Sequence, residues 1–358
     1  MGMQREPTPD ALALAVAAAI PGFTRRDLDA GWSMLGLDSF DLVSLRLAVE
    51  QALGSEISDE DWVAAATPGH LFRLAARTTR AGSAPEASSF SIAETVELAM
   101  PQMALGGLSE SWLLKMLGDL HWRLIAAALG TRSSDIRDGL GNRLYPAFTR
   151  VRYVASQPLA AFAEGEALSF RASLSRFGGS LYFSAVSASG ARGRAISADL
   201  MSSFTLRGAS GRNIDLLRGQ PALPPPARVP VLGEMPVVGA EYGRRRAEKD
   251  AARPVLDRSR YELLPQYDIN GVGLLYYAAY PLIADICQMR RSPQGAGWAS
   301  ATSPLARDAY YFANADITSV LEWRLHRDDA GDGLCTESSI VRDDGVVMAY
   351  IESRKAST

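Results

Sequence analysis

The stretch that decides the fold runs from Gly106 to Leu129 and reads GGLSESWLLKMLGDLHWRLIAAAL. Two glycines and a serine come first, and a long apolar run follows them. Leu113, Met116 and Leu120 recur within that run at helical spacing. The pattern predicts a turn that leads into one long buried helix.

The same order of features returns in the second half of the chain. Asn270-Gly271-Val272-Gly273 is followed by an apolar stretch that passes through Leu275, Tyr277 and Tyr280 towards Ile286. We therefore expect a second buried helix to open directly after the second glycine of this turn.

Alternating residues predict strands after each of these helices. Apolar side chains alternate with polar ones in two stretches, at Leu168, Phe170, Ala172 and Leu174, and at Leu321, Trp323 and Leu325. Such alternation is typical of half-buried antiparallel strands. A turn, a buried helix and a run of strands thus occur twice, which predicts an α+β double hotdog: antiparallel sheets wrapped around central helices.

Two breaks in composition divide the chain of 358 residues. One is the small-residue stretch from 81 to 89, and the other is the Pro-rich stretch from 220 to 226. The predicted division is a four-helix domain (1–80), a linker (81–90), a first hotdog (91–220), a Pro-rich and charged connector (221–260) and a second hotdog (261–358).

Charge and cysteine content exclude several classes of protein. The chain has 37 Lys and Arg against 40 Asp and Glu, a net charge of −3, which argues against a nucleic-acid partner. Two cysteines cannot form a disulfide framework. Neither a secretory signal nor a long apolar span is evident, so we expect a cytoplasmic protein with no membrane partner. Neither a metal-ligand spacing nor a dinucleotide fingerprint appears, so no metal, nicotinamide or flavin is expected.

The N-terminal domain contains Gly36-Leu37-Asp38-Ser39-Phe40-Asp41, a serine at a helix start between acidic residues. A simple capping serine would explain this local pattern. However, the block also contains Ile57-Ser58-Asp59-Glu60-Asp61-Trp62, and Thr67-Pro68 that opens its last helix. Together these segments resemble an acyl carrier protein. The resemblance implies a phosphopantetheine on Ser39, attached by a phosphopantetheinyl transferase.

The three histidines offer little for catalysis. His121 lies inside the first apolar helix and is expected to be packed, whereas His326 is expected to be solvated on the polar face of a strand. His70 belongs to the last helix of the carrier-like domain. A hotdog dehydratase therefore lacks its histidine. Gly107-Leu108-Ser109-Glu110-Ser111 also fails to complete the serine elbow of common acyltransferases.

Residues 95 to 355 resemble the bifunctional acyltransferase/decarboxylase of leinamycin polyketide biosynthesis. The likeness rests on Tyr267 to Pro281 and, more weakly, on Ala309 to Asn314 and Arg143 to Phe148. It implies that a malonyl or methylmalonyl unit is taken from coenzyme A and decarboxylated. Acetyl or propionyl is then loaded on a carrier thiol, either the chain's own or that of another polyketide synthase protein.

The nucleophile implied for this reaction is a tyrosine. We assign Tyr145, because Arg143 lies two residues away and its charge would stabilise a phenolate. Tyr267 and Tyr277 are the alternatives.

Stabilisation of the enolate requires donors near the thioester oxygen. Backbone N–H groups at helix starts suit this role, which indicates Gly271 and Gly273 in the second turn and Gly107, Leu108 and Ser109 in the first. Asn270 would position the acyl carbonyl or cap the helix.

Two other functions stay open. The hotdog pair would be a thioesterase or dehydratase acting on carrier-bound chains, or a non-catalytic module that binds acyl carriers. The basic run Arg244-Arg245-Arg246 is expected to be solvated, although it would also suit the phosphates of coenzyme A.

Overall fold

The computed structural model describes residues 90–222, 229–330 and 334–357, together with scattered positions between 16 and 72. Ser39 and the stretch 81–89 lie outside the described residues.

The first unit is a strand, a long helix and four further strands. Its elements are β1 (Phe90–Glu97), α5 (Glu110–Leu129), β4 (Tyr145–Ala155), β5 (Ala167–Phe177), β6 (Leu181–Ser189) and β7 (Ala195–Arg207). The strands lie side by side in the order β1-β5-β6-β7-β4, all antiparallel. Short strands β2 (Met103–Ala104) and β3 (Gly107–Leu108) pair with each other, and β8 (Leu216–Arg218) pairs with β7.

The second unit repeats this plan. It comprises β9 (Asp257–Glu262), α7 (Pro265–Asp268), α8 (Ala279–Arg291), α9 (Ala296–Ala301), β10 (Thr302–Tyr311), β11 (Val320–Ala330), β12 (Leu334–Arg342) and β13 (Val347–Ser357). The lateral order β9-β11-β12-β13-β10 matches that of the first unit strand for strand. The predicted α+β duplication is therefore confirmed.

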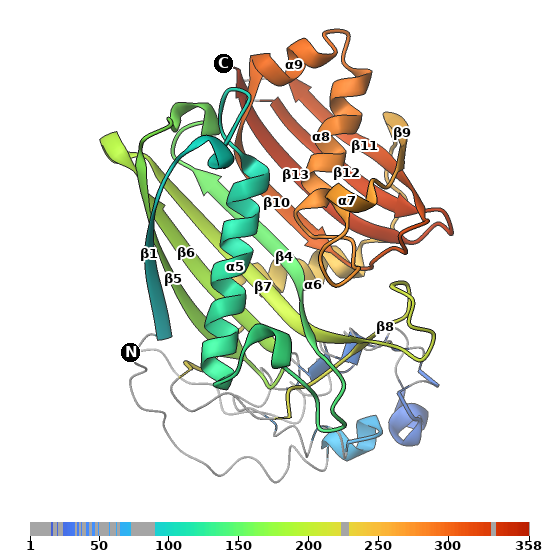
Figure 1. Cartoon of the computed structure of the whole chain (residues 1–358). Coiled ribbons are helices and arrows are strands. Elements are labelled where there is room, and N and C mark those ends of the chain that lie inside the picture. Colours follow the sequence, from blue (N-terminus) through green and yellow to red (C-terminus); the bar gives the residue numbers. More distant parts are fainter. Residues whose placement is uncertain are drawn as a thin grey trace, which may run out of the picture.

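The two units share one continuous sheet instead of forming two separate ones. β4 pairs with β10 antiparallel, so that 11 strands form a single sheet. Helices α5 and α8 lie on the same face of it, one over each half (Figure 1). The structure is hotdog-like, with one long antiparallel sheet that carries both helices.

Helix α5 has the predicted bounds. The Ser109 hydroxyl accepts a hydrogen bond from the Trp112 N–H (3.3 Å), and Gly130 ends the helix at a left-handed φ of 65°. Leu113, Leu117 and the other buried leucines on one face of the helix pack on the sheet.

Helix α8 begins later than the sequence predicts. It starts at Ala279, so Gly271 and Gly273 belong to a loop and do not form a helix start. The loop is closed by Asn270, whose side-chain oxygen accepts from the N–H groups of Val272 (3.1 Å) and Leu274 (3.0 Å).

A buried ion cluster joins the two units. Arg307 on β10 donates to Glu110 at the start of α5 (2.8 Å) and to Asp285 on α8 (2.9 Å). Lys355 lies 2.8 Å from the same aspartate. Burial opposes ionisation of Asp285, but the positive charges of Arg307 and Lys355 prevail and hold its pKa below its usual value.

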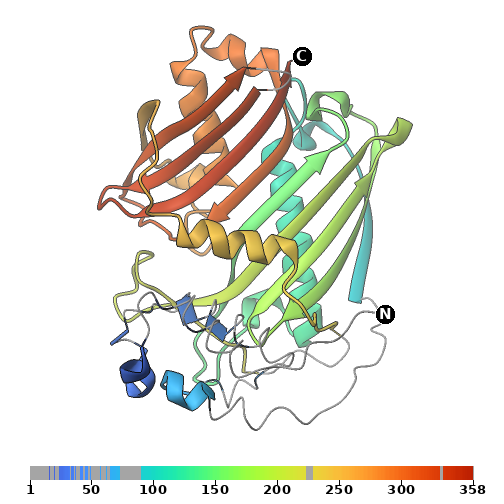
Figure 2. The same ribbon diagram turned by 180° about the vertical axis from the view of Figure 1, so that it is seen from behind.

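Helix α6 (Val237–Ala247) crosses the other face of the sheet (Figure 2). An aromatic cluster lies there: Phe177, Leu181, Phe183, Met201, Tyr242, Tyr310, Phe312 and Tyr350. The prediction of a solvated basic run is therefore wrong for two of its three arginines. The side chains of Arg245 and Arg246 are only 15% and 6% exposed, whereas that of Arg244 is 56% exposed.

The prediction for His326 is wrong for a related reason. The connector that carries α6 covers its strand face, and both ring nitrogens are bonded, to the Pro254 carbonyl and the Ser339 hydroxyl (2.8 Å each). Burial lowers the pKa of His326.

The described part of the N-terminal segment contains a small apolar core: Val16, Ile20, Leu45, Val49, Ile57, Ala65 and Leu71. The Thr67 hydroxyl accepts from the His70 N–H (3.3 Å), which confirms the predicted start of the last helix. The other expected helices fall largely outside the described residues.

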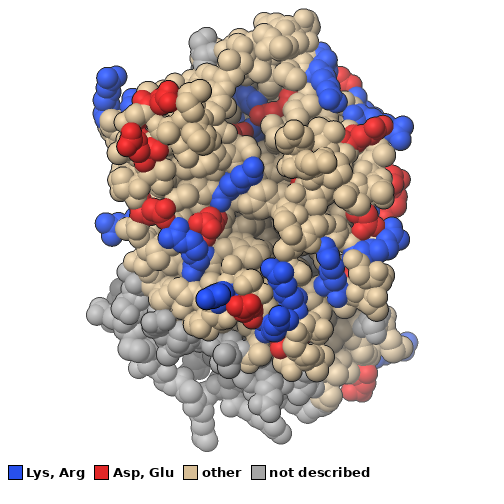
Figure 3. Space-filling view, in the orientation of Figure 1, with Lys and Arg blue, Asp and Glu red and all other residues tan. Residues whose placement is uncertain are grey.

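None of the helices in the described ranges has both the length and the apolar character needed to cross a membrane. On the face seen in Figure 3, basic and acidic side chains of the described residues are interspersed.

Candidate functional site

A cavity of about 530 Å³ lies between the two units. Helix α5 forms one wall, the beginning of β4 another, and the loop before α8 and the end of β10 close the far side. Its chemistry-bearing residues are Lys115, Asp119, Arg123, Ser133, Tyr145, Thr149, Thr205, Asn213, Asn270, Tyr276, Tyr277, Tyr280, Tyr311 and Asn314.

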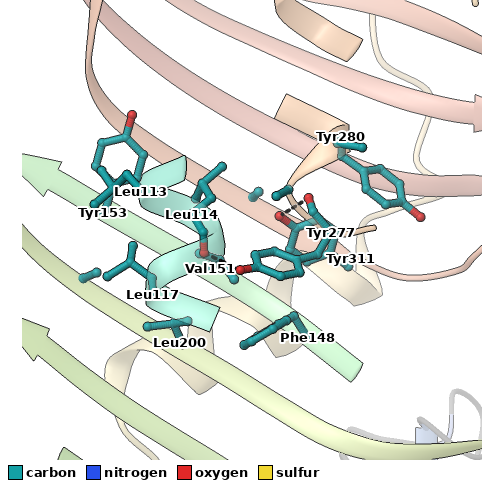
Figure 4. Close-up of a cluster of buried hydrophobic side chains, with 14 of the residues drawn as sticks. Leu113, Leu114, Leu117, Phe148, Val151, Tyr153, Leu200, Tyr277, Tyr280 and Tyr311 are labelled. Atoms are coloured by element: carbon teal, nitrogen blue, oxygen red, sulfur yellow. Dashed lines mark hydrogen bonds between the residues drawn. The ribbon is translucent and has the colours of Figure 1, made fainter. Parts of the chain in front are cut away.

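The floor of the cavity is aromatic and buried. Tyr277 packs against Phe148 with 4.3 Å between ring centroids, and Tyr311 packs edge-on against Tyr277 at 6.3 Å. Figure 4 shows these rings beside the leucines of α5. An apolar floor of this kind suits a hydrocarbon group.

Tyr145 is brought to the cavity as the sequence predicts. It begins β4, and the Arg143 guanidinium stacks over its ring with Cζ 5.1 Å from the centroid. Arg143 precedes the strand instead of sharing its face, but the pairing of the two side chains holds. A cation over an aromatic face is attracted by the ring electrons.

Tyr145 differs from its neighbours in having a free hydroxyl. The hydroxyls of Tyr277, Tyr280 and Tyr311 donate to the backbone carbonyls of Leu114, Ala313 and Tyr277. The Tyr145 hydroxyl has no hydrogen-bond partner among the residues that the structure describes. It is therefore available to a molecule in the cavity.

The loop before α8 supplies backbone and amide donors. Gly271 lines the cavity, a Cβ built on it would meet nothing within 4 Å, and its N–H has no partner in the described part of the chain. The Asn270 side chain also lines the cavity, and its oxygen is already used within the loop. Gly273 forms the turn itself. Its φ is +81°, and its N–H already donates to the Asn270 carbonyl (2.9 Å), so it is not available to a ligand.

The other predicted donors lie elsewhere. Gly107, Leu108 and Ser109 do not line the cavity. A Cβ on Gly107 would lie 2.5 Å from the backbone of Ala160, and the Ser109 hydroxyl caps α5. Close packing leaves no room for a thioester at this helix start, so these three residues are not part of the site.

The alternative tyrosines fail for separate reasons. Tyr267 is 75% exposed on α7 and lies outside the cavity lining. Tyr277 lines the cavity, but burial raises the pKa of its hydroxyl well above the usual value. A phenolate nucleophile is therefore disfavoured at Tyr277.

His121 is packed, as predicted. It is fully buried between the hydroxyls of Ser184 and Ser202 (2.7 Å each). Burial lowers its pKa to about 3, so the ring is neutral at physiological pH. No histidine is found among the described residues that line the cavity.

Sequence reasoning missed Asp119, which supplies the one carboxylate among the described lining residues. It stands four residues before Arg123 on α5, and the two side chains form an exposed ion pair at 3.2 Å. Helical spacing places Lys115, Asp119 and Arg123 on one face, and that signal is visible in the sequence.

Two asparagines that fix the far wall were also missed. Asn213 donates to the carbonyls of Gly273 (2.6 Å) and Ala315 (3.0 Å), which ties the β7–β8 loop to the second unit. Asn314 accepts from the Leu275 N–H (3.0 Å). Their partners are distant in sequence, so no local pattern reveals them.

Comparisons with known proteins identify the N-terminal segment. Residues 13–74 match the family model described as the phosphopantetheine attachment site. This segment is a carrier domain. It brings a phosphopantetheine attachment site into the same chain as the hotdog pair, and with it modification by a phosphopantetheinyl transferase.

Solved structures that are similar to the hotdog pair include proteins named thioesterases. A protein named an oleoyl thioesterase from Lactobacillus plantarum is 13% identical, with a TM-score of 0.53 over 76% of this chain and 97% of its own. The 12:0-ACP thioesterase from Umbellularia californica is 9% identical, with a TM-score of 0.50 over 76% and 100%. A search of curated proteins found no match. At these identities the likeness establishes the fold alone.

Proposed function

We propose that the hotdog pair is an enzyme that acts on acyl thioesters in the cavity between its two units. The main support for this proposal is the carrier domain in the same chain, because its prosthetic group supplies a thiol that bears acyl groups as thioesters. A cavity with an aromatic floor, a free hydroxyl and an unpaired backbone N–H at Gly271 suits such a substrate.

Acyl transfer is the reaction that Tyr145 favours. Its oxygen would attack the thioester carbon, the phenol proton would pass to the departing thiolate, and a tyrosyl ester and free coenzyme A would form. Arg143, stacked on the ring, attracts the electron density of the attacking phenol. The phosphopantetheine thiol of the carrier would then attack this ester, take over the acyl group and return the Tyr145 phenol. We place the attachment of the phosphopantetheine at Ser39.

The loop before α8 would stabilise the charge that develops on the acyl oxygen. Gly271 and Asn270 are neighbours in the cavity lining, so the Gly271 N–H and the Asn270 amide are the candidate donors. With a malonyl or methylmalonyl unit, cleavage of the C–C bond releases CO2 and leaves its electron pair on the enolate. Protonation of that enolate gives acetyl or propionyl. This reaction fits polyketide assembly, where such units are primed on carriers.

Hydrolysis is the second candidate, and the fold comparison favours it. Both of the structures reported above are named thioesterases. Asp119 would serve as the base that takes a proton from water, so that the products are a free acid and a thiol.

One experiment separates these reactions. The phosphopantetheinylated chain is offered malonyl- and methylmalonyl-CoA, and intact-protein mass is followed together with free acids in solution. A gain of acetyl or propionyl that is lost in Tyr145→Phe supports transfer with decarboxylation. Free acid whose release is lost in Asp119→Asn supports hydrolysis. Ser39→Ala, which we expect not to accept phosphopantetheine, is the control for the carrier.

A module without catalysis would give neither product. Acyl thioesters bound without turnover would contradict the proposed function.

A further inference from the structure

Tyr277 is one of the buried aromatic residues that form the floor of the cavity. Its ring is buried, with 8% of the residue exposed, and packs on Phe148 with the centroids 4.3 Å apart. The rim is more open: the side chain of Asp119 is 58% exposed, and Ile214 is 37% exposed. A chain that enters at the rim would therefore run towards the buried aromatic floor, of which the ring of Tyr277 is part.

Tyr277 is held in place through both its side chain and its backbone. Its hydroxyl donates to the Leu114 carbonyl on α5, and its own carbonyl accepts from the Tyr311 hydroxyl (3.1 Å). The Asn314 side chain bonds the backbone of Leu275 in both directions. These bonds fix the segment that carries Tyr277, so the ring is a rigid wall.

The helix opposite is shaped to receive this wall. Gly118 is buried in the middle of α5, and a Cβ there would lie 2.1 Å from the Tyr277 hydroxyl oxygen. Only a glycine leaves room for the phenol to reach the Leu114 carbonyl. The wall thus depends on residues from both units.

Behind the wall lies apolar core. Leu114, Leu117, Val151 and Leu200 are each at most 2% exposed, and Figure 4 shows them grouped next to Tyr277 on the side of the first unit. A longer acyl chain would enter this region only if the ring moved. That movement would break the packing of the ring on Phe148 and leave the buried hydroxyl without its partner, which is costly.

We infer that Tyr277 sets the length of the acyl group and restricts the enzyme to short acyl thioesters. This inference rests on the proposed function, since it assumes that the cavity holds the acyl group. It separates this chain from the two structures reported above, whose names refer to oleoyl and 12:0 substrates.

The test compares acyl groups of different length in the full chain. Propionyl- and octanoyl-CoA are offered separately to the wild type, Tyr277→Ala and Tyr277→Phe, and the ratio of the two kcat/KM values is measured. Tyr277→Phe loses the hydroxyl bond but keeps the ring, its packing on Phe148 and the backbone bonds of its segment, and so keeps the wall. Tyr277→Leu, which shortens the side chain while keeping it apolar, replaces the alanine variant if that variant fails to fold.

The expected wild-type ratio favours propionyl by at least about tenfold, since even one methylene in a shaped pocket is worth that much. Tyr277→Ala should shift the ratio towards octanoyl by at least about tenfold. Tyr277→Phe should keep the wild-type ratio.

Two results would overturn the inference alone while leaving the proposed function intact: equal use of both acyl groups by the wild type, or the same ratio in Tyr277→Ala as in Tyr277→Phe. Failure of the wild type to turn over any acyl thioester would remove the proposed function and the inference together.

Discussion

Gly118 on α5 and Tyr277 before α8 are fitted to each other across the boundary between the two units. A Cβ on the glycine would lie 2.1 Å from the tyrosine hydroxyl oxygen, closer than real contacts allow. Each unit of the duplicated fold therefore constrains the other at the floor of the cavity.

The fit predicts that Gly118→Ala destabilises the hotdog pair. Alanine normally stabilises a helix relative to glycine by about 1 kcal/mol. Here the added methyl group would push the tyrosine off its carbonyl, and we expect a net loss of about 1–3 kcal/mol in the free energy of unfolding. Urea denaturation measures it. Gly243→Ala on α6, where a Cβ would meet nothing within 4 Å, is the matched control and should be neutral or stabilising.

The free hydroxyl of Tyr145 predicts a loss of turnover in Tyr145→Phe. If this oxygen is the nucleophile, its removal should lower kcat by at least about a hundredfold, the scale of a lost catalytic group. Tyr267→Phe, on an exposed side chain outside the cavity, should leave kcat unchanged. Equal rates for the two variants would exclude a nucleophilic role for Tyr145.

The ion cluster at the junction predicts a large effect of Glu110→Ala. Arg307 has a side chain only 1% exposed, and loss of Glu110 leaves its charge partly uncompensated. Breaking a buried pair from one side typically costs about 3–5 kcal/mol. By contrast, Glu94→Ala breaks an exposed pair with Arg123 and should cost at most about 1 kcal/mol. Equally small losses in thermal denaturation of the two variants would contradict a stabilising role for the cluster.

His121 predicts a pH-dependent stability. Burial lowers the pKa of the folded ring from 6.5 to about 3, so between these values the unfolded chain binds a proton that the folded chain refuses. Stability should therefore be full above pH 6.5 and fall with decreasing pH by up to about 1.4 kcal/mol per unit. Unfolding titrations at several pH values should show this slope reduced in His121→Gln. The exposed His70→Gln variant should keep it.

Local signals in the sequence were enough for α5 and for the duplication. Ser109 caps the first turn of α5, and Gly130 ends the helix. Both ends are therefore set by residues that lie next to the helix in the sequence. The second helix was placed too early, because the apolar residues from Leu275 to Tyr280 resemble a helical face. Pro281, which lies in the first turn of α8, was the overlooked signal for the true start.

Errors on the outer face had a different origin. Arg245, Arg246 and His326 all looked solvated, since polar residues on a helix or on alternate strand positions usually are. Helix α6 and the connector that carries it cover that face. A local sequence pattern does not show which part of a sheet a distant segment covers.

The residues of the candidate site could be predicted from the sequence where the partners lie close together in one segment of the chain. Tyr145 with Arg143, and Asn270 with Gly271, are such pairs, and the structure brings both to the cavity. For Asp119, the sequence shows the helix face that it shares with Lys115 and Arg123, but only the structure shows that this face lines the cavity. The first glycine turn lies outside the cavity, because glycines also serve close packing, as Gly107 does.

The central claim, that the cavity is the acyl-thioester site, is tested most directly by filling it. A side chain on Gly271 would project into open space, so Gly271→Phe should fold and occlude the cavity. Gly139→Phe, also in open space but outside the lining, is the control. Turnover of propionyl- and methylmalonyl-CoA by the phosphopantetheinylated chain should fall at least about a hundredfold in Gly271→Phe and persist in Gly139→Phe. Full turnover in a folded Gly271→Phe variant would show that the chemistry takes place elsewhere.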